Sequence, residues 1–367
     1  MGRPVNTSSA PVLNAIGLAC PEHLHSQETL IDAFTTAQSL SSRDARRLRA
    51  VFTRAGIERR RGCLPLHGDP ENTSLLDVLT RPATTGERMS LFAREAPRLL
   101  RSACQDLLSR LDDPSVLEDV RDLRVASCTG FLAPGLDRVL VEELGLRSDV
   151  HRTLVGFQGC QAGLVGLRDA AMACRVEPGH RSLVACLELS SLHVQAGADE
   201  DPLVGNALFG DGAALALVSG AEVTDSDGPH LTAARSDLHA AEADAMTWTV
   251  GDAGFALHLD SRLAGLLAAG LRRLTEEPSW QAVLSDRDAW AVHPGGPAIL
   301  GAVREALDLS DEALAASRAV LAEHGNMSSP TIFFVLERLL RDPNWQRGVA
   351  LAFGPGLSTE AIALERA

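Results

Sequence analysis

Short apolar segments alternate with helical stretches along most of this chain, and no other feature limits its possible folds so strongly. The apolar segments have the length of buried strands, and they cover residues 124–127, 152–156, 182–188, 213–218, 289–292, 349–353 and 360–364. The helical stretches cover residues 91–108, 161–174, 260–274, 297–306 and 330–340. Strands that alternate with helices predict a layered α/β fold in which helices cover the faces of sheets.

An acidic segment with glycine and proline, residues 221–230, is the best candidate for a connection between two parts of the chain. We therefore divide the sequence into residues 1–225 and residues 226–367. Both parts contain βα units, but no residue-level repeat is strong enough to prove a duplication.

The composition excludes several classes of partner. The net charge is −14, and no run of basic residues is long enough for a nucleic-acid groove. If the substrates are anionic, a local basic patch must overcome this acidic field. Seven cysteines without a CxxC pair fit a reducing compartment, and no apolar stretch is long enough to span a membrane. The polar N-terminus shows no signal-peptide pattern. We expect a soluble, cytoplasmic protein.

The first candidate for chemistry is Cys160, in the segment 154–163. A strand pattern runs into a glycine turn, and a helix pattern begins directly after the cysteine. Unpaired amides and the positive end of the helix dipole favour a thiolate at such a position. A small buried cysteine in a βα turn would show the same pattern, so this segment alone does not decide between the two interpretations.

The second candidate is His293, which ends a strand and is followed by a turn that contains Gly295 and Gly296. A strand-end histidine beside open backbone can act as a general base or as the cationic partner of a thiolate. The third is Asn326, just ahead of a helix whose predicted N-cap is Ser329, with Pro330 at the first helical position. Taken singly, each fits an ordinary turn residue at least as well.

Together the three segments favour one site. Cys160, His293 and Asn326 each lie at a glycine-bearing turn beside a strand end or a helix start, so all three side chains could reach one pocket. A cysteine with a histidine gives an ion-paired nucleophile, and an amide beside them gives an oxyanion donor. This set could serve a papain-like hydrolase or a condensing enzyme.

Five motifs in this sequence resemble those of the type III polyketide synthases, the chalcone-synthase-like enzymes of plants and bacteria. They are VGFQGCQAG around Cys160, GNALFGDGAA from Gly205, HPGGPAIL from His293, GNMSS from Gly325 and AFGPGLS from Ala352. The motifs stand in the family's order from Ser127 to the C-terminus. The first 120 residues match only loosely.

The resemblance implies a thiolase fold, a five-layer α/β/α/β/α arrangement built from two similar halves, and a homodimer. It implies an acyl-CoA starter and malonyl-CoA as substrates, with no metal and no redox cofactor. By position, Cys160 is the acyl-bearing nucleophile, in the N-terminal half, and His293 and Asn326 are its partners, in the C-terminal half.

The same resemblance assigns further residues to substrates. Phe209 matches the phenylalanine that gates the passage between the CoA tunnel and the cavity, and Ala133 matches a residue near the dimer interface that reaches toward the partner's cavity. The CoA-binding edge is assigned to Arg54, Gly295 and Gly296, with the arginine run at 59–61. The other substrate-binding positions that it assigns are Cys128, His193, Trp248, Leu257, Gly354 and Pro355.

Two of these positions leave the product length open. Leu257 stands where the family usually has a second gatekeeping phenylalanine, and it could widen the passage. Trp248 matches a position whose bulk limits the cavity, which favours a shorter chain. Two alternatives also remain: a ketoacyl synthase that initiates fatty-acid synthesis from acyl carrier protein, and a catalytically silent partner subunit of the same fold.

Overall fold

The structure is a computed structural model that describes residues 9–68, 73–81, 83–197, 199–223 and 227–366. The predicted boundary between residues 225 and 226 lies outside the described residues. The strands are β1 Val12–Ala19, β2 His23–Ser26, β3 Arg59–Gly62, β4 Val120–Ser127, β5 His151–Gly156, β6 Arg181–Leu189, β7 Asp211–Ser219, β8 His230–Leu238, β9 Met246–Gly251, β10 Gly254–Leu259, β11 Ala289–Val292, β12 Arg347–Gly354 and β13 Ser358–Glu365. The α-helices are α1 Gln27–Ala37, α2 Ser42–Arg54, α3 Leu75–Thr80, α4 Thr85–Ser109, α5 Leu136–Glu143, α6 Ala162–Val176, α7 Glu200–Leu208, α8 Leu263–Glu276, α9 Pro278–Leu284, α10 Pro297–Ala306, α11 Ala315–His324 and α12 Thr331–Leu340.

Within the described residues, nine strands form one continuous sheet in the order β11-β12-β13-β8-β1-β7-β6-β4-β5. The sheet has an N-terminal part, from β1 to β5, and a C-terminal part, from β11 to β8. Strands β1 and β8 are paired in register only at Val12 and His230, so the two parts behave as two sheets that meet at one end. Strand β5 is an edge strand that pairs only with β4.

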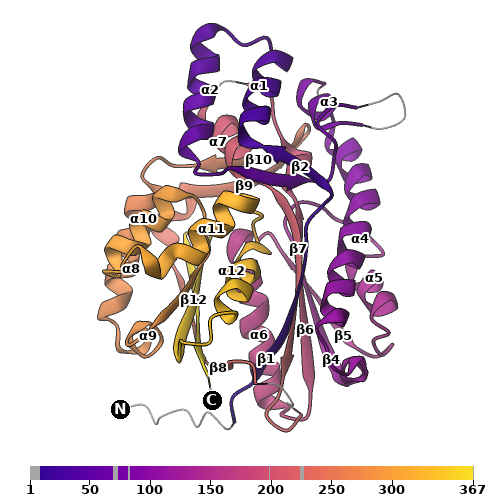
Figure 1. Ribbon diagram of the computed structural model, residues 1–367, viewed down its shortest axis with the longest axis vertical. Helices are drawn as coiled ribbons and strands as arrows, with labels where there is room; N and C mark the ends of the chain where they lie inside the picture. The colour runs from indigo at the N-terminus through magenta and orange to yellow at the C-terminus, as the bar shows by residue number, and fades with distance from the viewer. Residues whose placement is uncertain (1–8, 69–72, 82, 198, 224–226, 367) are drawn as a thin grey trace.

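Helices separate these two parts and cover their outer faces (Figure 1). Helix α4 packs on β1 and β7, α6 and α12 pack between the two parts, and α9 packs on β8 and β13. Three apolar cores fill the interfaces between these layers. The chain therefore has the predicted five-layer α/β/α/β/α arrangement of the thiolase fold, in which each sheet part is buried on both faces.

Helix α6 can lie in the central layer because small residues face its neighbours. A Cβ atom on Gly163 would lie 2.5 Å from the backbone oxygen of Ser329, and one on Gly166 would lie 2.8 Å from the side chain of Val184. Both distances are shorter than a real contact allows, so glycine is required for this close packing. The packing brings the first turn of α6 against the segment that leads into α12.

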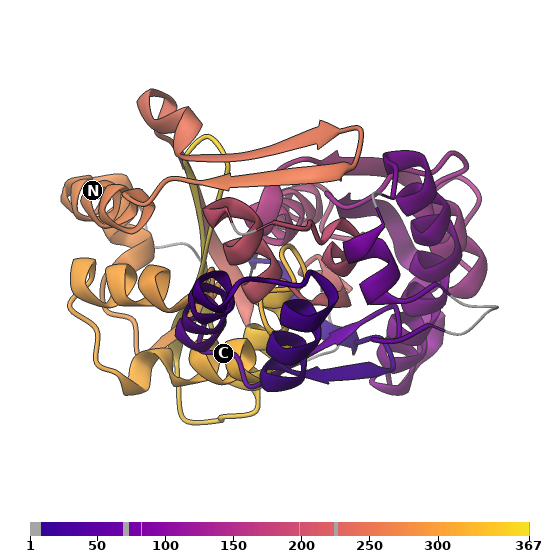
Figure 2. The same cartoon turned by 90° about the horizontal axis from the view of Figure 1, so that it is seen from above.

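All seven predicted strands and all five predicted helices are present, several of them longer than expected. The sequence interpretation missed β1 and β8, the two strands at which the sheet parts meet. It also missed the β9–β10 hairpin, which extends from the C-terminal part toward the N-terminal helices (Figure 2). There the amide of Thr85, at the start of α4, donates to the carbonyl oxygen of Asp252, 2.8 Å away.

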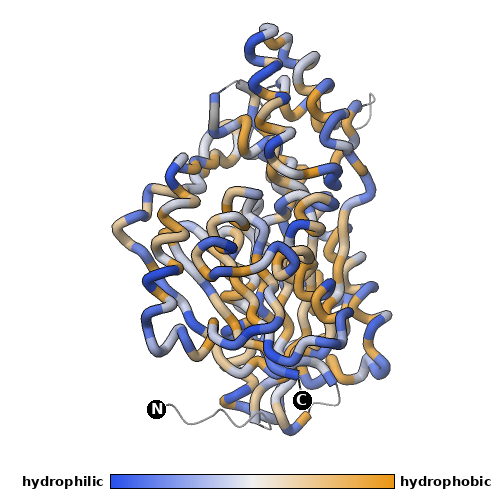
Figure 3. The backbone as a smooth tube through the Cα atoms, turned by 60° about the vertical axis from the view of Figure 1, so that its left-hand side comes forward, coloured by the Kyte–Doolittle hydropathy of each residue, from blue (hydrophilic) through white to orange (hydrophobic). Residues whose placement is uncertain are grey.

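Hydropathy follows the layers. Hydrophobic segments run through the middle of the molecule, and hydrophilic segments gather at outer loops and on the helices at the top (Figure 3). No described helix has both the length and the apolar character that a membrane span requires.

Candidate active site

Cys160 lies where strand β5 turns into helix α6. Phe157 and Gly159 have positive φ angles of 54° and 62°, and a short 3₁₀ turn carries Cys160 into the helix. A Cβ atom on Gly159 would lie 2.5 Å from Cδ of Pro355, so only glycine fits there. The predicted position of Cys160 at a helix N-terminus is confirmed.

Cys160, His293 and Asn326 line one cavity of about 410 Å³, which we call the main cavity. Nδ2 of Asn326 lies 3.8 Å from Sγ of Cys160. His293 follows β11 and is 1% exposed, and neither of its ring nitrogens has a hydrogen-bond partner among the described residues. The structure thus brings together the three side chains that the sequence singled out.

The side-chain amide of Asn326 lies beside the sulfur of Cys160, with Nδ2 at 3.8 Å and Oδ1 at 3.9 Å from Sγ. Its Oδ1 also accepts a hydrogen bond from the amide of Ser328 at 2.7 Å, so Nδ2 is the atom with donor capacity left for a ligand. Its backbone pairs with the residues around Phe209, because Asn326 N donates to Leu208 O and Gly210 N donates to Asn326 O. The amide donor and the predicted gate are therefore parts of one rigid unit.

Burial keeps the Cys160 thiol and the His293 imidazole neutral in this state. It raises the pKa of Cys160 to about 11, although hydrogen bonds from Ser328 and Asn326 act in the opposite direction. Burial also lowers the pKa of His293 to about 3. The expected thiolate–imidazolium pair is not present here, because the two groups make no hydrogen bond and burial disfavours each charge separately.

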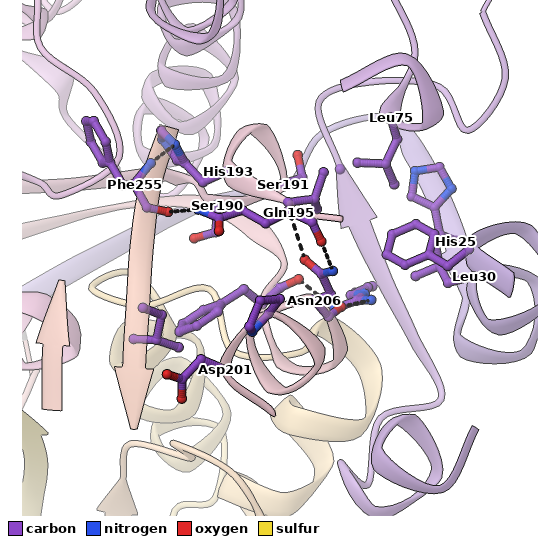
Figure 4. A pocket seen from close by; sticks show the side chains of 18 of the residues that line it. His25, Leu30, Leu75, Ser190, Ser191, His193, Gln195, Asp201, Asn206 and Phe255 are labelled. Atoms are coloured by element: carbon purple, nitrogen blue, oxygen red, sulfur yellow. Dashed lines mark hydrogen bonds between the residues drawn. The ribbon is translucent and has the colours of Figure 1, made fainter. Parts of the chain in front are cut away.

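The main cavity adjoins a second, smaller space of about 60 Å³, which we call the small pocket; Figure 4 shows it, with Ser190, His193 and Asn206 among its lining residues. Four side chains line both spaces: Ser190, Phe209, Trp248 and Leu257. The Arg60 guanidinium holds the backbone of the segment 206–209, since it donates to the carbonyl oxygens of Phe209 and Asn206.

Trp248 and Leu257 face each other across the β9–β10 hairpin. Nε1 of Trp248 donates to the carbonyl oxygen of Cys128 at 2.8 Å, which anchors the indole to the segment after β4. Cys128 lines the main cavity, and its sulfur accepts a hydrogen bond from the Gly159 amide at 3.3 Å. Burial raises the pKa of the Cys128 thiol well above its ordinary value.

His193 lines the small pocket rather than the main cavity. Its Nε2 lies 2.8 Å from Thr129 O, and its Nδ1 accepts a hydrogen bond from the Phe255 amide at 3.1 Å. This requires a neutral ring with the proton on Nε2. Burial lowers the pKa of His193 to about 4, and its ring stacks on Phe255 with centroids 4.2 Å apart.

Glu188, which the sequence interpretation missed, lies beneath the site at the end of β6. Its carboxyl group accepts hydrogen bonds from Cys128 N (2.9 Å) and from the hydroxyls of Thr129 and Ser329 (2.7 Å each). Burial raises the pKa of Glu188 to about 7. The predicted N-cap role of Ser329 is wrong, because the helix is capped at Pro330 and the Ser329 hydroxyl donates to Glu188 instead. For Glu188, the available signal was an acidic residue next to the last position of a strand whose preceding residues are apolar from Leu183 to Leu187.

The residues assigned to CoA divide into two groups. Arg54 is exposed and lines the main cavity together with Gly295 and Gly296. The expectation for Arg60 is wrong, since its side chain is buried and bound to backbone carbonyls of the gate segment. Arg61 donates to the carbonyl oxygens of Pro21 and Glu22 and lines the small pocket.

The remaining assigned residues lie around the site. Pro355 lines the main cavity, whereas Gly354 packs beneath the nucleophile's turn, where a Cβ atom would lie 2.7 Å from Gln158 O. Ala133 lines a separate groove beside the edge strand β5. Its expected reach into a partner's cavity stays a prediction. No group of three or more described His, Cys, Asp or Glu side chains could hold a metal ion.

Comparisons with known proteins agree on a family. The N-terminal domain of chalcone and stilbene synthases matches residues 3–222, and the C-terminal domain matches residues 238–366. The chain is 31% identical to the alpha-pyrone synthesis polyketide synthase-like Pks18 of Mycobacterium tuberculosis and of Mycobacterium bovis, over 99% of this chain and 93% of the relative.

Solved structures are similar over nearly the whole chain. PKS-I from the brown alga Ectocarpus siliculosus has a TM-score of 0.89 and 27% identity, covering 98% of this chain and 99% of that one. The C-terminal type III polyketide synthase domain of Steely1, a type I/III hybrid from Dictyostelium, has a TM-score of 0.89 and 25% identity, covering 97% and 99%.

Proposed function

The chain belongs to the family of chalcone and stilbene synthases, the type III polyketide synthases, and we propose that Cys160 carries the growing acyl chain in this enzyme. It condenses malonyl-CoA units iteratively onto an acyl-CoA starter and closes the product to an aromatic or pyrone ring. The observation that carries the assignment is that Cys160, His293 and Asn326 line one cavity. The name of the mycobacterial relatives favours a pyrone.

In the loading step, the Cys160 sulfur attacks the thioester carbonyl of the starter. Its proton passes to an unpaired ring nitrogen of His293, which lines the same cavity. The new carbon–sulfur bond forms as the old one breaks, and CoA leaves as a thiol after taking the proton back. Approach of the thiol to the imidazole stabilises both charges, so the ion pair absent from the resting state forms when it is needed.

In the extension step, malonyl-CoA loses carbon dioxide and becomes a thioester enolate. Negative charge develops on the thioester oxygen, and Nδ2 of Asn326 is free to donate to it, because Oδ1 is already bound by Ser328. Nε2 of His293 supplies a second donor when it carries the proton. The enolate carbon then attacks the thioester carbonyl on Cys160, the carbon–sulfur bond to Cys160 breaks, and Cys160 leaves as a thiolate. The chain, now two carbons longer, stands on CoA and returns to Cys160 by the same thioester exchange, which releases CoA, before the next extension.

CoA binds at the Arg54 side of the main cavity. Arg54 supplies positive charge at the rim, and Gly295 and Gly296 allow backbone to approach the ligand closely. The reaction requires no metal and no redox cofactor, since each step transfers an acyl group, a proton or carbon dioxide.

The enzyme acts as a homodimer in this proposal. Strand β5 offers an unpaired edge, and Leu154 on it is 65% exposed beside Phe131, which is 48% exposed. Apolar side chains on an open strand edge favour pairing with a second copy. Ala133 lies in the same groove, which supports its proposed reach toward the partner. Light scattering should give twice the monomer mass of 38.9 kDa, and a monomer would contradict the proposal.

All seven cysteines are free thiols, which supports the expectation of a reducing, cytoplasmic location.

Intact-protein mass spectrometry tests the assignment. Incubation with an acyl-CoA starter should add one acyl group, and peptide mapping should place it on Cys160. Addition of malonyl-CoA should then release polyketide products. An adduct on another residue, or none from a panel of short and long starters, would contradict the proposal.

A further inference from the structure

The β9–β10 hairpin forms one wall of the main cavity, although it lies outside the nine-stranded sheet. Among the described residues its two strands pair only with each other, and a two-stranded hairpin is marginally stable by itself. Trp248 and Leu257 face each other on the two strands, and both line the main cavity. The contacts that hold the hairpin in place therefore also set the position of this wall.

Thr85, at the start of α4, binds the turn of the hairpin. Its amide donates to the carbonyl oxygen of Asp252 at 2.8 Å. Its hydroxyl donates to the carbonyl oxygen of Gly251 and accepts a hydrogen bond from the amide of Gly254 at 2.9 Å. Gly251 and Gly254 are the last pair of the β9–β10 ladder, so one hydroxyl bridges the two strands where the chain turns. We call these three hydrogen bonds the Thr85 clip.

Helix α4 does not need the Thr85 hydroxyl for its own N-terminus. Thr84 is the N-cap, and its hydroxyl accepts a hydrogen bond from the amide of Glu87. The Glu87 carboxylate accepts one from the amide of Thr84, which completes a capping box. Both hydrogen bonds of the Thr85 hydroxyl go to the hairpin instead.

Arg88, three residues further along α4, packs against the same turn. A Cβ atom on Gly254, whose φ angle is +103°, would lie 2.8 Å from Cδ of Arg88, so the two residues are in close contact. The Arg88 guanidinium also donates to the carbonyl oxygens of Leu192 and Val194, the two neighbours of His193. The start of α4 therefore holds the hairpin turn and one wall of the small pocket together.

Phe255 connects the turn to the cavity wall. Its amide donates to Nδ1 of His193, and its carbonyl oxygen accepts from Nε2 of Gln195, at 3.1 Å each (Figure 4). Phe255 and Leu257 are two residues apart on β10, so their side chains point to the same face of the strand. A displacement of the turn therefore moves Phe255 and Leu257 together.

The hairpin has room to move away from the main cavity. On the face opposite Trp248 and Leu257, the paired residues Thr249 and Ala256 are exposed. A growing chain that presses on Trp248 or Leu257 therefore pushes the hairpin outward, unless its turn is fixed.

We propose that Thr85 is a positioning residue that limits chain length, because its clip holds the hairpin against the main cavity and makes Trp248 and Leu257 a fixed wall. This rests on the proposed function, since the growing polyketide is what meets the wall. Thr85 is not among the residues that line either space, so it acts through the hairpin and not by contact with substrate.

Two substitutions of Thr85 test the role of its hydroxyl. Thr85→Val keeps the shape of the side chain and the amide bond to Asp252, but removes the bonds to Gly251 and Gly254. It should raise kcat/KM for a long acyl-CoA starter about fivefold relative to a short one, and shift product masses toward longer chains. Loading of a short starter on Cys160 should not change. Thr85→Ser keeps the hydroxyl and should give the wild-type products.

Thr275→Val is a matched control. It removes a hydroxyl that donates to the carbonyl oxygen of Arg272 within α8, and it should give wild-type products. If Thr85→Val were less stable but made products of wild-type length, the clip would serve stability alone and the inference would be wrong. A shift shared by Thr85→Ser would also overturn it. Absence of polyketide from the wild type with every starter would contradict the proposed function itself.

Hydrogen exchange measures the clip without turnover. In folded Thr85→Val, peptides that cover residues 246–259 should exchange about 10-fold faster than in the wild type, because two hydrogen bonds that hold the turn are lost. Thr85→Ser and Thr275→Val should exchange like the wild type in this segment. Unchanged exchange of the hairpin in Thr85→Val would show that other contacts fix the wall, and would overturn the inference.

Discussion

The small pocket and the main cavity each contain a buried histidine and a buried asparagine, but the two pairs differ in their hydrogen bonds. The pair in the small pocket is bound to backbone atoms, and the pair in the main cavity is not. In the small pocket, the amide of Asn206 exchanges two hydrogen bonds with the backbone of Gln195, at 2.7 and 3.2 Å. Both ring nitrogens of His193 are also bound. In the main cavity, both ring nitrogens of His293 have no partner among the described residues, and the Asn326 NH₂ makes a long contact of 3.8 Å with the sulfur of Cys160.

This difference distinguishes polar side chains that stabilise the fold from those that take part in the reaction. A buried polar group without a partner costs free energy, so a fold retains it only where a ligand or transition state completes the bond. A histidine and an asparagine therefore stabilise the wall of the small pocket, whereas in the main cavity the same two residue types can bind the negative charge that develops on the substrate. Four predictions test whether this contrast is real.

The largest effect should come from the nucleophile. Cys160→Ala should abolish acyl loading and polyketide formation, because no other group in the main cavity can carry the chain as a thioester in that position. Intact mass after incubation with acyl-CoA measures this directly. Cys128→Ala removes the second thiol that lines the cavity, and that variant should still form the adduct. Loss of the adduct only in Cys128→Ala would show that Cys128, and not Cys160, carries the acyl group.

The two asparagines give the sharpest test of the contrast. Asn326→Ala should slow the decarboxylation of malonyl-CoA about 10²–10³-fold, because it removes a donor to the developing enolate. Acyl loading on Cys160 should persist. Asn206→Ala removes a satisfied pair, so it should lower the free energy of unfolding by about 1–3 kcal/mol with little change in decarboxylation per folded enzyme. Release of carbon dioxide and denaturant unfolding measure the two effects. An equal loss of decarboxylation in Asn326→Ala and Asn206→Ala would contradict the assignment of a catalytic role to Asn326 and a structural role to Asn206.

Much of this site was predictable, because its chemistry lies in residues at strand and helix ends. Cys160, His293 and Asn326 each stand beside a glycine-bearing turn, where local sequence determines the backbone. Distances between turns are set by the packing of α6 between the sheets, and no local pattern encodes that packing. The resting protonation states were missed for the same reason, since they follow from burial.

The errors have particular causes as well. The arginines of 59–61 looked like one solvated charge run, but β3 is a strand, so the side chain of Arg60 turns inward while Arg59 faces solvent. Strand β8 was missed because most of its residues are only partly buried and several are polar, so it lacks the apolar pattern of a buried strand. Its pairing with β13 is a tertiary effect.

The third prediction concerns acid stability. Burial lowers the pKa of His193 to about 4, below its ordinary value near 6.5. Between these values the unfolded chain binds a proton that the folded protein does not, so stability is lost as the pH falls from about 6.5 to 4. The loss from this residue is about 3 kcal/mol. Glu188 acts in the opposite direction, because burial raises its pKa to about 7 and its contribution falls as the pH rises from 4.5.

A variant comparison isolates this contribution. His193→Gln should be less stable at pH 7, and it should lose about 3 kcal/mol less than the wild type between pH 7 and pH 4, measured by denaturant unfolding. Parallel pH profiles for the two proteins would show that folding does not change the pKa of His193, and would contradict the prediction.

The smallest effect should come from substitution of Trp248, which lies between the small pocket and the main cavity. Its indole lines both spaces and is anchored to the Cys128 carbonyl, so Trp248→Ala should join the small pocket to the main cavity. A starter longer by one or two methylenes should then gain about 10-fold in kcat/KM relative to a short starter, since one methylene in a pocket contributes about 1–3 kcal/mol. Leu257→Phe, on the opposing strand, adds bulk at the same wall and should shift the preference toward short starters. Product masses from paired starters measure both shifts. If the two variants shifted chain length in the same direction, the acyl chain would not extend from the main cavity into the small pocket, and the growing chain would occupy another space.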